Sequence, residues 1–273
     1  MNFGSELLTF AVGAFAGGLG ALLGIGGGVI LIPFLNIALG LTFNQSSGIS
    51  LITIIATSSA ASAAKGRMQL VNLRLGMVLE VFTTSGGVIG LWLFGKTDSH
   101  TVRIAFAWTL VAIAMIMLSR ISKRNVLDPT AEIGQLGGRY FDKETGGEVA
   151  YRLKRAPVAF VMSFLAGVVS NFGIGGGILK VPALNAWCGV PIRAAAATSS
   201  LMLGATAFVV ATDRFRHGEI IPELAAAAVL GVLGGTQVGV WAQHRFHPKT
   251  HKLVMVALLL SVAALYFSGV GKR

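Results

Sequence analysis

A run of 58 consecutive residues, from Leu7 to Ala64, contains no Asp, Glu, Lys or Arg. A soluble fold needs polar residues on the outer face of each helix or strand, so a run of this length is incompatible with water. A bilayer core takes about 20 apolar residues per spanning helix, and the run is long enough for more than two such helices. It therefore predicts a polytopic membrane protein, and it excludes a soluble enzyme, a secreted disulfide scaffold and a disordered chain.

The rest of the chain alternates between apolar segments and short charged stretches. Only 12% of the residues are charged, against about 25% in soluble domains, and 13 of the 33 charges lie within residues 120–155. We expect a first transmembrane repeat over 1–119, an extramembrane loop over 120–156 and a second repeat over 157–273. Two alternating runs around a Gly-containing turn predict a small hairpin between Gly138 and Leu153. The candidate helices cover residues 7–23, 28–40, 46–64, 75–95, 104–119, 157–172, 177–190, 194–212, 224–243 and 253–269.

The chain contains an internal duplication. The segment Gly24–Asn36 recurs as Gly173–Asn185, and both copies begin Gly-Ile-Gly-Gly-Gly and share a later Pro, Leu and Asn. A nearly constant offset over this length indicates two homologous repeats of about five hydrophobic segments each. Further matches at offsets of 149 or 150 pair Gly40 with Gly189, Ser50 with Ser200, Gly90 with Gly239 and Thr101 with Thr250.

One short segment in each repeat suggests where a site lies. Segments 28–40 and 177–190 would form only about 20 Å of helix against a bilayer core of about 30 Å, and each begins at a Gly triplet. Repeats with such interruptions are the usual construction of secondary transporters, whose substrate site lies at the repeat interface near the bilayer midplane. We therefore expect an all-α polytopic membrane protein with two inverted repeats and a short Gly-interrupted or re-entrant helix in each half.

The net charge of +11 indicates how the chain is oriented in the membrane. Membrane proteins retain Lys and Arg in cytoplasmic loops, and no basic run here interleaves with aromatic residues, so we expect no nucleic-acid partner. With the central loop inside, the cytoplasmic side holds 15 Lys or Arg and the outer side 6, whether the short segments span or are re-entrant. The count places the loop 120–156 in the cytoplasm and leaves both topologies open.

The duplicated glycines predict an anion-binding break in each half. Glycine lets the backbone unwind and lets a ligand approach the peptide groups closely. The short helix after each break points free N–H groups and a partial positive charge back at it. The alternative is that these glycines only permit close helix packing, as expected for Gly13/Gly17, Gly20/Gly24, Gly86/Gly90 and Gly235/Gly239. The candidate residues of the breaks are Gly26, Gly27, Gly28, Gly175, Gly176 and Gly177.

Two charges lie inside apolar segments. Lys180 falls one turn into the second short helix, where the first repeat has Leu31, and a bound anion would reduce the cost of a cation at that position. The alternative is that Lys180 extends to the membrane interface. Glu80 is a candidate proton carrier, or it pairs with Arg74 near the headgroups.

Several polar residues recur near the breaks. Hydroxyl groups suit an oxyanion, although small polar residues also join membrane helices by hydrogen bonds. Packing is the preferred interpretation for Thr53 and Thr57, which lie on one helical stripe with Ser46 and Ser50. The substrate-binding candidates are Asn36, Ser50, Asn185, Thr198, Ser199 and Ser200.

Other chemistry has little support in the sequence. His244, His247 and His251 have no acidic or Cys partner nearby and Pro248 interrupts their common face, so we interpret them as loop residues and expect no metal. The Gly motif lacks the spacing of a nucleotide-binding loop, and no hydrolase motif is present, so we expect neither a cofactor nor an enzyme.

The duplicated Gly-Ile-Gly-Gly-Gly-x-x-x-x-Pro pattern, followed by an Ala/Ser/Thr-rich helix such as residues 194–200, resembles the sulfite exporter TauE/SafE family of membrane permeases. The likeness extends over nearly the whole chain. It implies a bacterial-type inner-membrane transporter for sulfur-containing anions such as sulfite, sulfoacetate or other sulfonates, energised by an ion gradient. The matching site residues are Gly24 to Gly28 and Gly173 to Gly177. The first such helix departs from the pattern at Ser46 to Ser50, and the central loop is longer than the pattern requires.

The resulting hypothesis is a secondary transporter that exports a small sulfur-containing oxyanion by alternating access. Its expected partners are that anion and the lipid bilayer. Whether the chain forms a homo-oligomer stays open. An anion channel built on the same repeats and a membrane scaffold that transports nothing are the alternatives.

Overall fold

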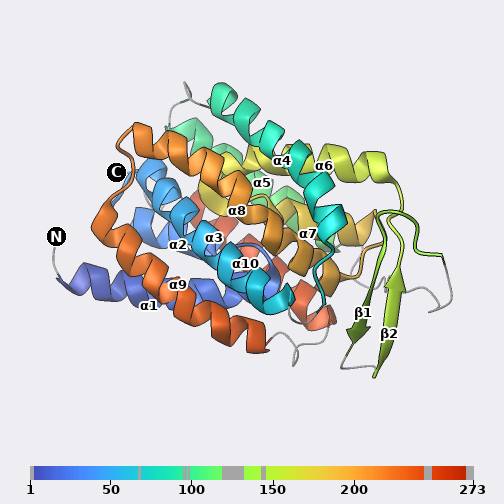
Figure 1. Cartoon of the computed structure of the whole chain (residues 1–273). Coiled ribbons are helices and arrows are strands. Elements are labelled where there is room, and N and C mark those ends of the chain that lie inside the picture. The colour runs from blue at the N-terminus through green and yellow to red at the C-terminus, as the bar shows by residue number, and fades with distance from the viewer. Residues whose placement is uncertain are drawn as a thin grey trace.

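The computed structural model of the chain describes residues 3–66, 69–94, 97, 99–118, 132–142, 146–242 and 248–268. These residues form a helical bundle with one small hairpin at its edge (Figure 1). The helices before the hairpin, called the first repeat below after the sequence duplication, are α1 (Phe3–Leu23), α2 (Gly28–Pro33), η1 (Phe34–Ala38), α3 (Phe43–Gly66), α4 (Leu73–Phe94) and α5 (Ser99–Leu118). The hairpin comprises β1 (Gly138–Asp142) and β2 (Gly147–Tyr151). The helices after it, called the second repeat, are α6 (Ala156–Val169), η2 (Ser170–Ile174), α7 (Gly177–Ala186), α8 (Ile192–Arg216), α9 (Pro222–Ala242) and α10 (Pro248–Phe267).

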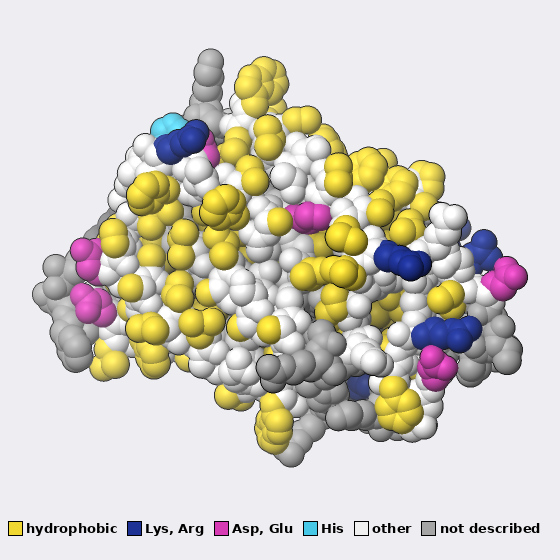
Figure 2. All heavy atoms as spheres, viewed as in Figure 1, with side chains coloured by type: hydrophobic (Ala, Val, Ile, Leu, Met, Phe, Trp, Pro, Cys, Tyr) yellow, Lys and Arg dark blue, Asp and Glu magenta, His cyan; other side chains and the backbone are white. Residues whose placement is uncertain are grey.

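The outer surface of the bundle is apolar. Within the described residues, seven helices are long and apolar enough to cross a membrane. Large side chains that a soluble protein would bury point outward, as Trp92, Trp108 and Trp241 do, and Trp92 is 83% exposed. Apolar side chains cover most of the face in Figure 2, and most charged side chains lie toward its edges. The prediction of an all-α polytopic membrane protein is confirmed.

The two short helices lie where the Gly triplets predict them. α2 and η1 together have 11 residues and α7 has 10, which is about 15 Å of helix and too short to cross a core of about 30 Å. All ten expected segments are helical, with ends that differ by a few residues. One interpretation was wrong. His251 lies in α10 rather than in a loop, because Pro248 at the first helical position favours an earlier start.

Each repeat packs its first helix against the fourth helix of the other repeat. α1 lies along α9 and α6 lies along α4, while α3 contacts α8 and α5 contacts α10 (Figure 1). Glycines make the first two contacts very close. A Cβ on Gly235 would overlap the Ala14 carbonyl oxygen, and a Cβ on Gly86 would overlap the Phe164 carbonyl oxygen. The expected packing role of the glycine pairs Gly86/Gly90 and Gly235/Gly239 is confirmed.

Gly235 and its neighbour Gly234 allow a matched test of this packing. Gly235→Ala is expected to lower the free energy of unfolding by about 1–3 kcal/mol, because the new methyl group forces α1 and α9 apart. Gly234→Ala meets no atom within 4 Å and should leave stability unchanged or raise it slightly through helix propensity. Thermal unfolding in detergent measures both. Equal stability of the two variants would contradict the packing role.

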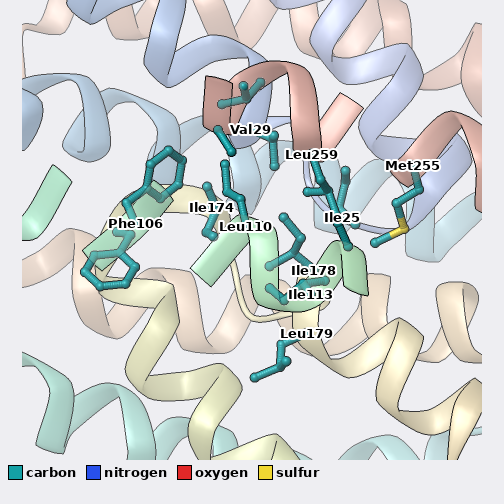
Figure 3. Close-up of a cluster of buried hydrophobic side chains, with 14 of the residues drawn as sticks. Ile25, Val29, Phe106, Leu110, Ile113, Ile174, Ile178, Leu179, Met255 and Leu259 are labelled. Atoms are coloured by element: carbon teal, nitrogen blue, oxygen red, sulfur yellow. The ribbon is translucent and has the colours of Figure 1, made fainter. Parts of the chain in front are cut away.

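One buried cluster joins the two repeats (Figure 3). Several of its members form pairs that lie 149 residues apart in the sequence, so equivalent positions of the two repeats belong to one cluster. α5, α10 and the segments around the two Gly triplets contribute these pairs. They include Ile25 with Ile174, Val29 with Ile178, Phe106 with Met255 and Leu110 with Leu259.

The predicted hairpin is confirmed. β1 and β2 pair antiparallel, with Gly138 opposite Tyr151. Tyr140, Val149 and Tyr151 belong to a buried cluster with residues of α4, α7 and α8, so the hairpin packs where the two repeats meet. Asn72, just before α4, connects it to the first repeat, because Asn72 Nδ2 donates to the carbonyl oxygens of Leu136 and Gly137.

Candidate functional site

The two Gly breaks lie against each other at the centre of the bundle. A Cβ on Gly28 would overlap the Gly173 carbonyl oxygen, and a Cβ on Gly177 would overlap the Gly24 carbonyl oxygen. Only glycine fits at such a junction of two backbones. The same segments contain Gly26 with φ 81° and Gly175 with φ 66°, a left-handed conformation that other residues avoid. The fold therefore brings together the two duplicated motifs, which are 149 residues apart in the sequence.

Two serines satisfy carbonyl groups that the breaks release. Ser50 Oγ donates to the Gly173 carbonyl oxygen at 2.6 Å, and Ser199 Oγ donates to the Gly24 carbonyl oxygen at 3.5 Å. By contacts, Ser50 thus corresponds to Ser199. The sequence comparison paired it with Ser200, whose Oγ instead donates to the Ala196 carbonyl oxygen of its own helix. Each serine hydroxyl connects one repeat to the break in the other.

The helices that follow the breaks begin without side-chain caps. Gly27 and Gly176 occupy the N-cap positions, and neither helix start receives a side-chain hydrogen bond. The first N–H groups of a helix have no partner inside it, so these two starts are polar positions able to attract an anion. In this conformation apolar side chains fill the adjacent space. Ile54 of α3 and Leu203 of α8 lie beside the Cα atoms of both Gly26 and Gly175.

The remaining polar candidates make structural hydrogen bonds. Asn36 Nδ2 donates to the Leu41 carbonyl oxygen at 2.7 Å, and Asn185 Nδ2 donates to the Val190 carbonyl oxygen at 2.9 Å, so both hold the chain after the short helices. Thr198 Oγ1 accepts a hydrogen bond from the backbone N–H of Asn72 at 3.0 Å. These contacts favour the packing alternative for the asparagines.

Lys180 and Glu80 form an ion pair inside the bundle. Lys180 Nζ lies 3.6 Å from Glu80 Oε2, and the exposed fractions of the two side chains are 0% and 16%. The Lys180 side chain is fully buried rather than extended to the surface, and the cation beside Glu80 is Lys180 rather than Arg74. The pair crosses the repeat boundary, since Glu80 belongs to α4 and Lys180 to α7.

Threonine hydroxyls complete the surroundings of the pair. Thr206 Oγ1 of α8 donates to Glu80 Oε1, Thr84 Oγ1 lies 3.4 Å from the same oxygen, and Lys180 Nζ lies 3.4 Å from Thr83 Oγ1. Thr83 and Thr206 are buried. Sequence reasoning missed both. The spacing of three residues between Glu80 and Thr83 was a signal, since it places them on one helix face, whereas nothing in the sequence indicated Thr206.

The equivalent contact between α2 and α9 has no counterpart of the Lys180–Glu80 pair. The residues 149 positions away from Lys180 and Glu80 are Leu31 and Val229. Leu31 packs in an apolar cluster with residues of α9, which include Leu224 and Ala228. The two halves therefore share their Gly breaks and differ at the helix contact beside them. Such asymmetry is unexpected for a contact that serves packing alone.

Another polar region lies outside the bundle. A cavity of about 200 Å³ separates the hairpin from the start of α4, and its lining includes Asn72, Arg74, Arg139 and Tyr151. Burial raises the pKa of the Tyr151 phenol, and its hydrogen bond with Asn72 opposes that rise. None of the predicted site residues lines this cavity.

A bundle of apolar helices with paired central breaks defines a polytopic membrane protein of the transporter class. Comparison with known proteins supports the same class. The model of the sulfite exporter TauE/SafE family matches residues 9–266, and the chain belongs to this family. No solved structure matches the chain.

Similar proteins include the probable membrane transporter protein YunE of Bacillus subtilis, with 26% identity over 97% of this chain and 99% of the relative. A probable membrane transporter protein of Xylella fastidiosa has 25% identity over 98% of this chain and 96% of the relative. The probable membrane transporter protein MJ0441 of Methanocaldococcus jannaschii has 24% identity over 95% of this chain and 94% of the relative. The chain is thus a multi-pass membrane transporter over its full matched length.

Proposed function

We propose that this protein is a secondary transporter that exports a small sulfur-containing oxyanion, such as sulfite or an organosulfonate like sulfoacetate, across the inner membrane. The observation that carries the proposal is the contact between the two duplicated Gly breaks, with Gly28 against Gly173 and Gly177 against Gly24. A transporter of this design binds its substrate between the repeats, where broken helices direct backbone groups at it. Family membership supports the sulfur-containing substrate.

In this proposal, alternating access uses the packing of each repeat's first helix on the other repeat. Because α1 packs on α9 and α6 on α4, each half has the same contacts with the other, as a pseudo-two-fold axis between the repeats requires. In this proposal the repeats are inverted, the loop 120–156 is cytoplasmic, and one repeat rocks against the other. Movement of Ile54 and Leu203 then opens the space beside Gly26 and Gly175.

The anion would bind to groups contributed by both repeats. The uncapped starts of α2 and α7 offer N–H groups at Gly26 to Gly28 and Gly175 to Gly177. Ser50 and Ser199, which now donate to the Gly173 and Gly24 carbonyl oxygens, would turn their hydroxyl groups to the anion when the breaks separate, and Lys180 offers a positive charge. Glu80 beside Lys180 is the proposed proton carrier, which would couple transport to an ion gradient.

Flux into liposomes containing the purified protein tests this function. We expect sulfite or sulfoacetate flux that saturates with concentration and increases with an imposed pH gradient, and slower flux of sulfate in the same panel. Flux that follows the membrane voltage without saturating would instead identify an anion channel. If no anion moves and a protein partner remains bound after gentle solubilisation, the chain is a scaffold and the proposal is wrong.

A further inference from the structure

The carboxylate of Glu80 is held by donors from three helices. Thr84 and Thr206 direct hydroxyl groups at Oε1, and Lys180 places its ammonium group 3.6 Å from Oε2. Glu80 Oε2 receives no hydrogen bond from the described residues. A carboxylate is itself a small oxyanion. The buried groups Lys180 Nζ and Thr206 Oγ1 therefore form a receptor for an oxyanion that a tethered side chain now occupies. Thr83 Oγ1 accepts a hydrogen bond from Lys180 Nζ and donates to the Leu79 carbonyl oxygen, so it positions the ammonium group.

We propose that the transported oxyanion binds in this receptor in place of the Glu80 carboxylate. The inference rests on the proposed function and deepens it, because it moves the charged part of the substrate site from the Gly breaks to the contact between α4, α7 and α8. The bound anion would accept hydrogen bonds from Lys180 and Thr206, in the position that the Glu80 carboxylate now occupies. Glu80 would leave the receptor while the anion is bound.

The position of Lys180 connects this receptor to the breaks. The backbone N–H of Lys180 donates to the Gly176 carbonyl oxygen at 3.1 Å, so Lys180 lies in the first turn after the second break. A change in backbone conformation at Gly175 or Gly176 therefore moves the ammonium group relative to α4. Anion binding at Lys180 and the conformation of the break are in this way mechanically linked.

The charge balance of the receptor determines how many protons accompany the exchange of the Glu80 carboxylate for the anion. The receptor holds one positive charge, so it compensates one negative charge, and a bound anion beside an ionised Glu80 would repel it across a buried site. Glu80 therefore takes up one proton from the aqueous phase as the anion takes its place on Lys180. No covalent bond changes other than the O–H bond formed at Glu80. The receptor thus takes a group with a single negative charge, such as the sulfonate group of an organosulfonate, in preference to the sulfate dianion.

On the helices around Glu80 and Lys180, the other titratable residues are few and stand near the helix ends. α6 carries no charged residue, and Lys180 is the one charged residue of α7. On α4, α5 and α8 the other charged or titratable residues stand near the helix ends, at Arg74, His100, Arg103, Arg193, Asp213, Arg214 and Arg216. Glu80 is consequently the group expected to take up the proton.

Calorimetric titration of the purified protein with sulfoacetate, in two buffers of different ionisation enthalpy, tests the exchange. We expect uptake of about one proton per anion bound. Protonation of Glu80 accompanies binding, so affinity is highest at low pH and falls by about tenfold per pH unit once Glu80 is ionised in the free protein. Glu80→Gln should bind the anion with no proton uptake and no pH dependence. Binding to the wild type without proton uptake, or pH dependence that persists in Glu80→Gln, would overturn the exchange.

Variants of the donors test the location of the receptor. Lys180→Met, made in the Glu80→Gln background so that no unpaired carboxylate remains, should lose anion binding. Thr206→Val should weaken binding by about tenfold, as expected for one hydrogen bond to a charged group. Thr57→Val is the matched control, because Thr57 is the residue of the first repeat equivalent to Thr206 and donates to its own helix at the Thr53 carbonyl oxygen. Its affinity should equal that of the wild type.

The outcomes separate this inference from the proposed function. Saturable flux that survives in the Lys180→Met, Glu80→Gln variant would overturn the receptor and leave the transporter in place. Proton-linked binding at Lys180 without flux in liposomes would support the receptor and contradict transport. Wild-type affinity in Thr206→Val would also overturn the receptor.

Discussion

Glu80→Leu is expected to lower the free energy of unfolding by about 3–5 kcal/mol, which is the cost of leaving a buried charge without its partner. Lys180 makes this cost large, because its side chain is completely buried and its one carboxylate neighbour in the described part of the chain is Glu80. For a chain of 273 residues the loss corresponds to a fall of about 10 °C in Tm. Thermal unfolding of the purified protein in one detergent measures it.

The equivalent contact between α2 and α9 supplies the control for this variant. The double variant Glu80→Val, Lys180→Leu installs the residues found at the equivalent positions, Val229 and Leu31, and removes both charges together. Replacing a buried ion pair by apolar residues of similar volume is often neutral or stabilising, so the double variant should regain most of the lost stability. It should nevertheless be inactive in flux assays. A double variant as unstable as Glu80→Leu would show that the pair contributes packing rather than charge compensation.

The secondary structure was predictable from the sequence wherever it depends on the local pattern of apolar, charged and glycine residues. The ten apolar segments follow from the distribution of charges, and the hairpin follows from alternation around a glycine turn. The position of the short helices follows from the duplicated Gly triplets, since a triplet of glycines does not continue a helix. In each case a few neighbouring residues in the sequence decide the structure.

Contacts between distant segments were not predictable in this way. Glu80 and Lys180 each look like an isolated charge in the sequence, because they are 100 residues apart and α4 and α7 come together only through packing. The choice between Ser199 and Ser200 shows a second limit. One residue along a helix is a rotation of about 100°, so an offset of 150 instead of 149 turns the hydroxyl away from the break.

The Gly breaks and the ion pair have different roles in the proposed cycle. The breaks are shared by both repeats and set the hinge, whereas the ion pair occurs at only one of the two equivalent helix contacts and sets the charge of the group that binds there. A transporter needs both repeats to rock, yet it needs only one cation for one sulfonate group. A single Lys180 in a duplicated chain agrees with that requirement, since a second buried cation at Leu31 would add cost without a ligand.

Gly28→Ala and Gly177→Ala are expected to reduce anion flux by at least about tenfold, through a clash worth about 1–3 kcal/mol in the state where the breaks touch. Neither glycine has a positive φ, so the substitution adds no backbone strain and its effect comes from the methyl group alone. That group meets the backbone carbonyl oxygen of Gly173 or Gly24, which cannot move aside as a flexible side chain would.

The two variants should have similar effects, because each disturbs one of two equivalent contacts across the repeat boundary. Gly234→Ala, which meets no atom within 4 Å, is the control for adding a methyl group to a helix of the same protein. Initial flux rates, normalised to the amount of folded protein in the liposomes, give the comparison. Wild-type flux in Gly28→Ala together with loss in Gly177→Ala would mean that only the second break moves during transport. Wild-type flux in both would mean that neither break takes part, and the substrate path would then lie elsewhere in the bundle.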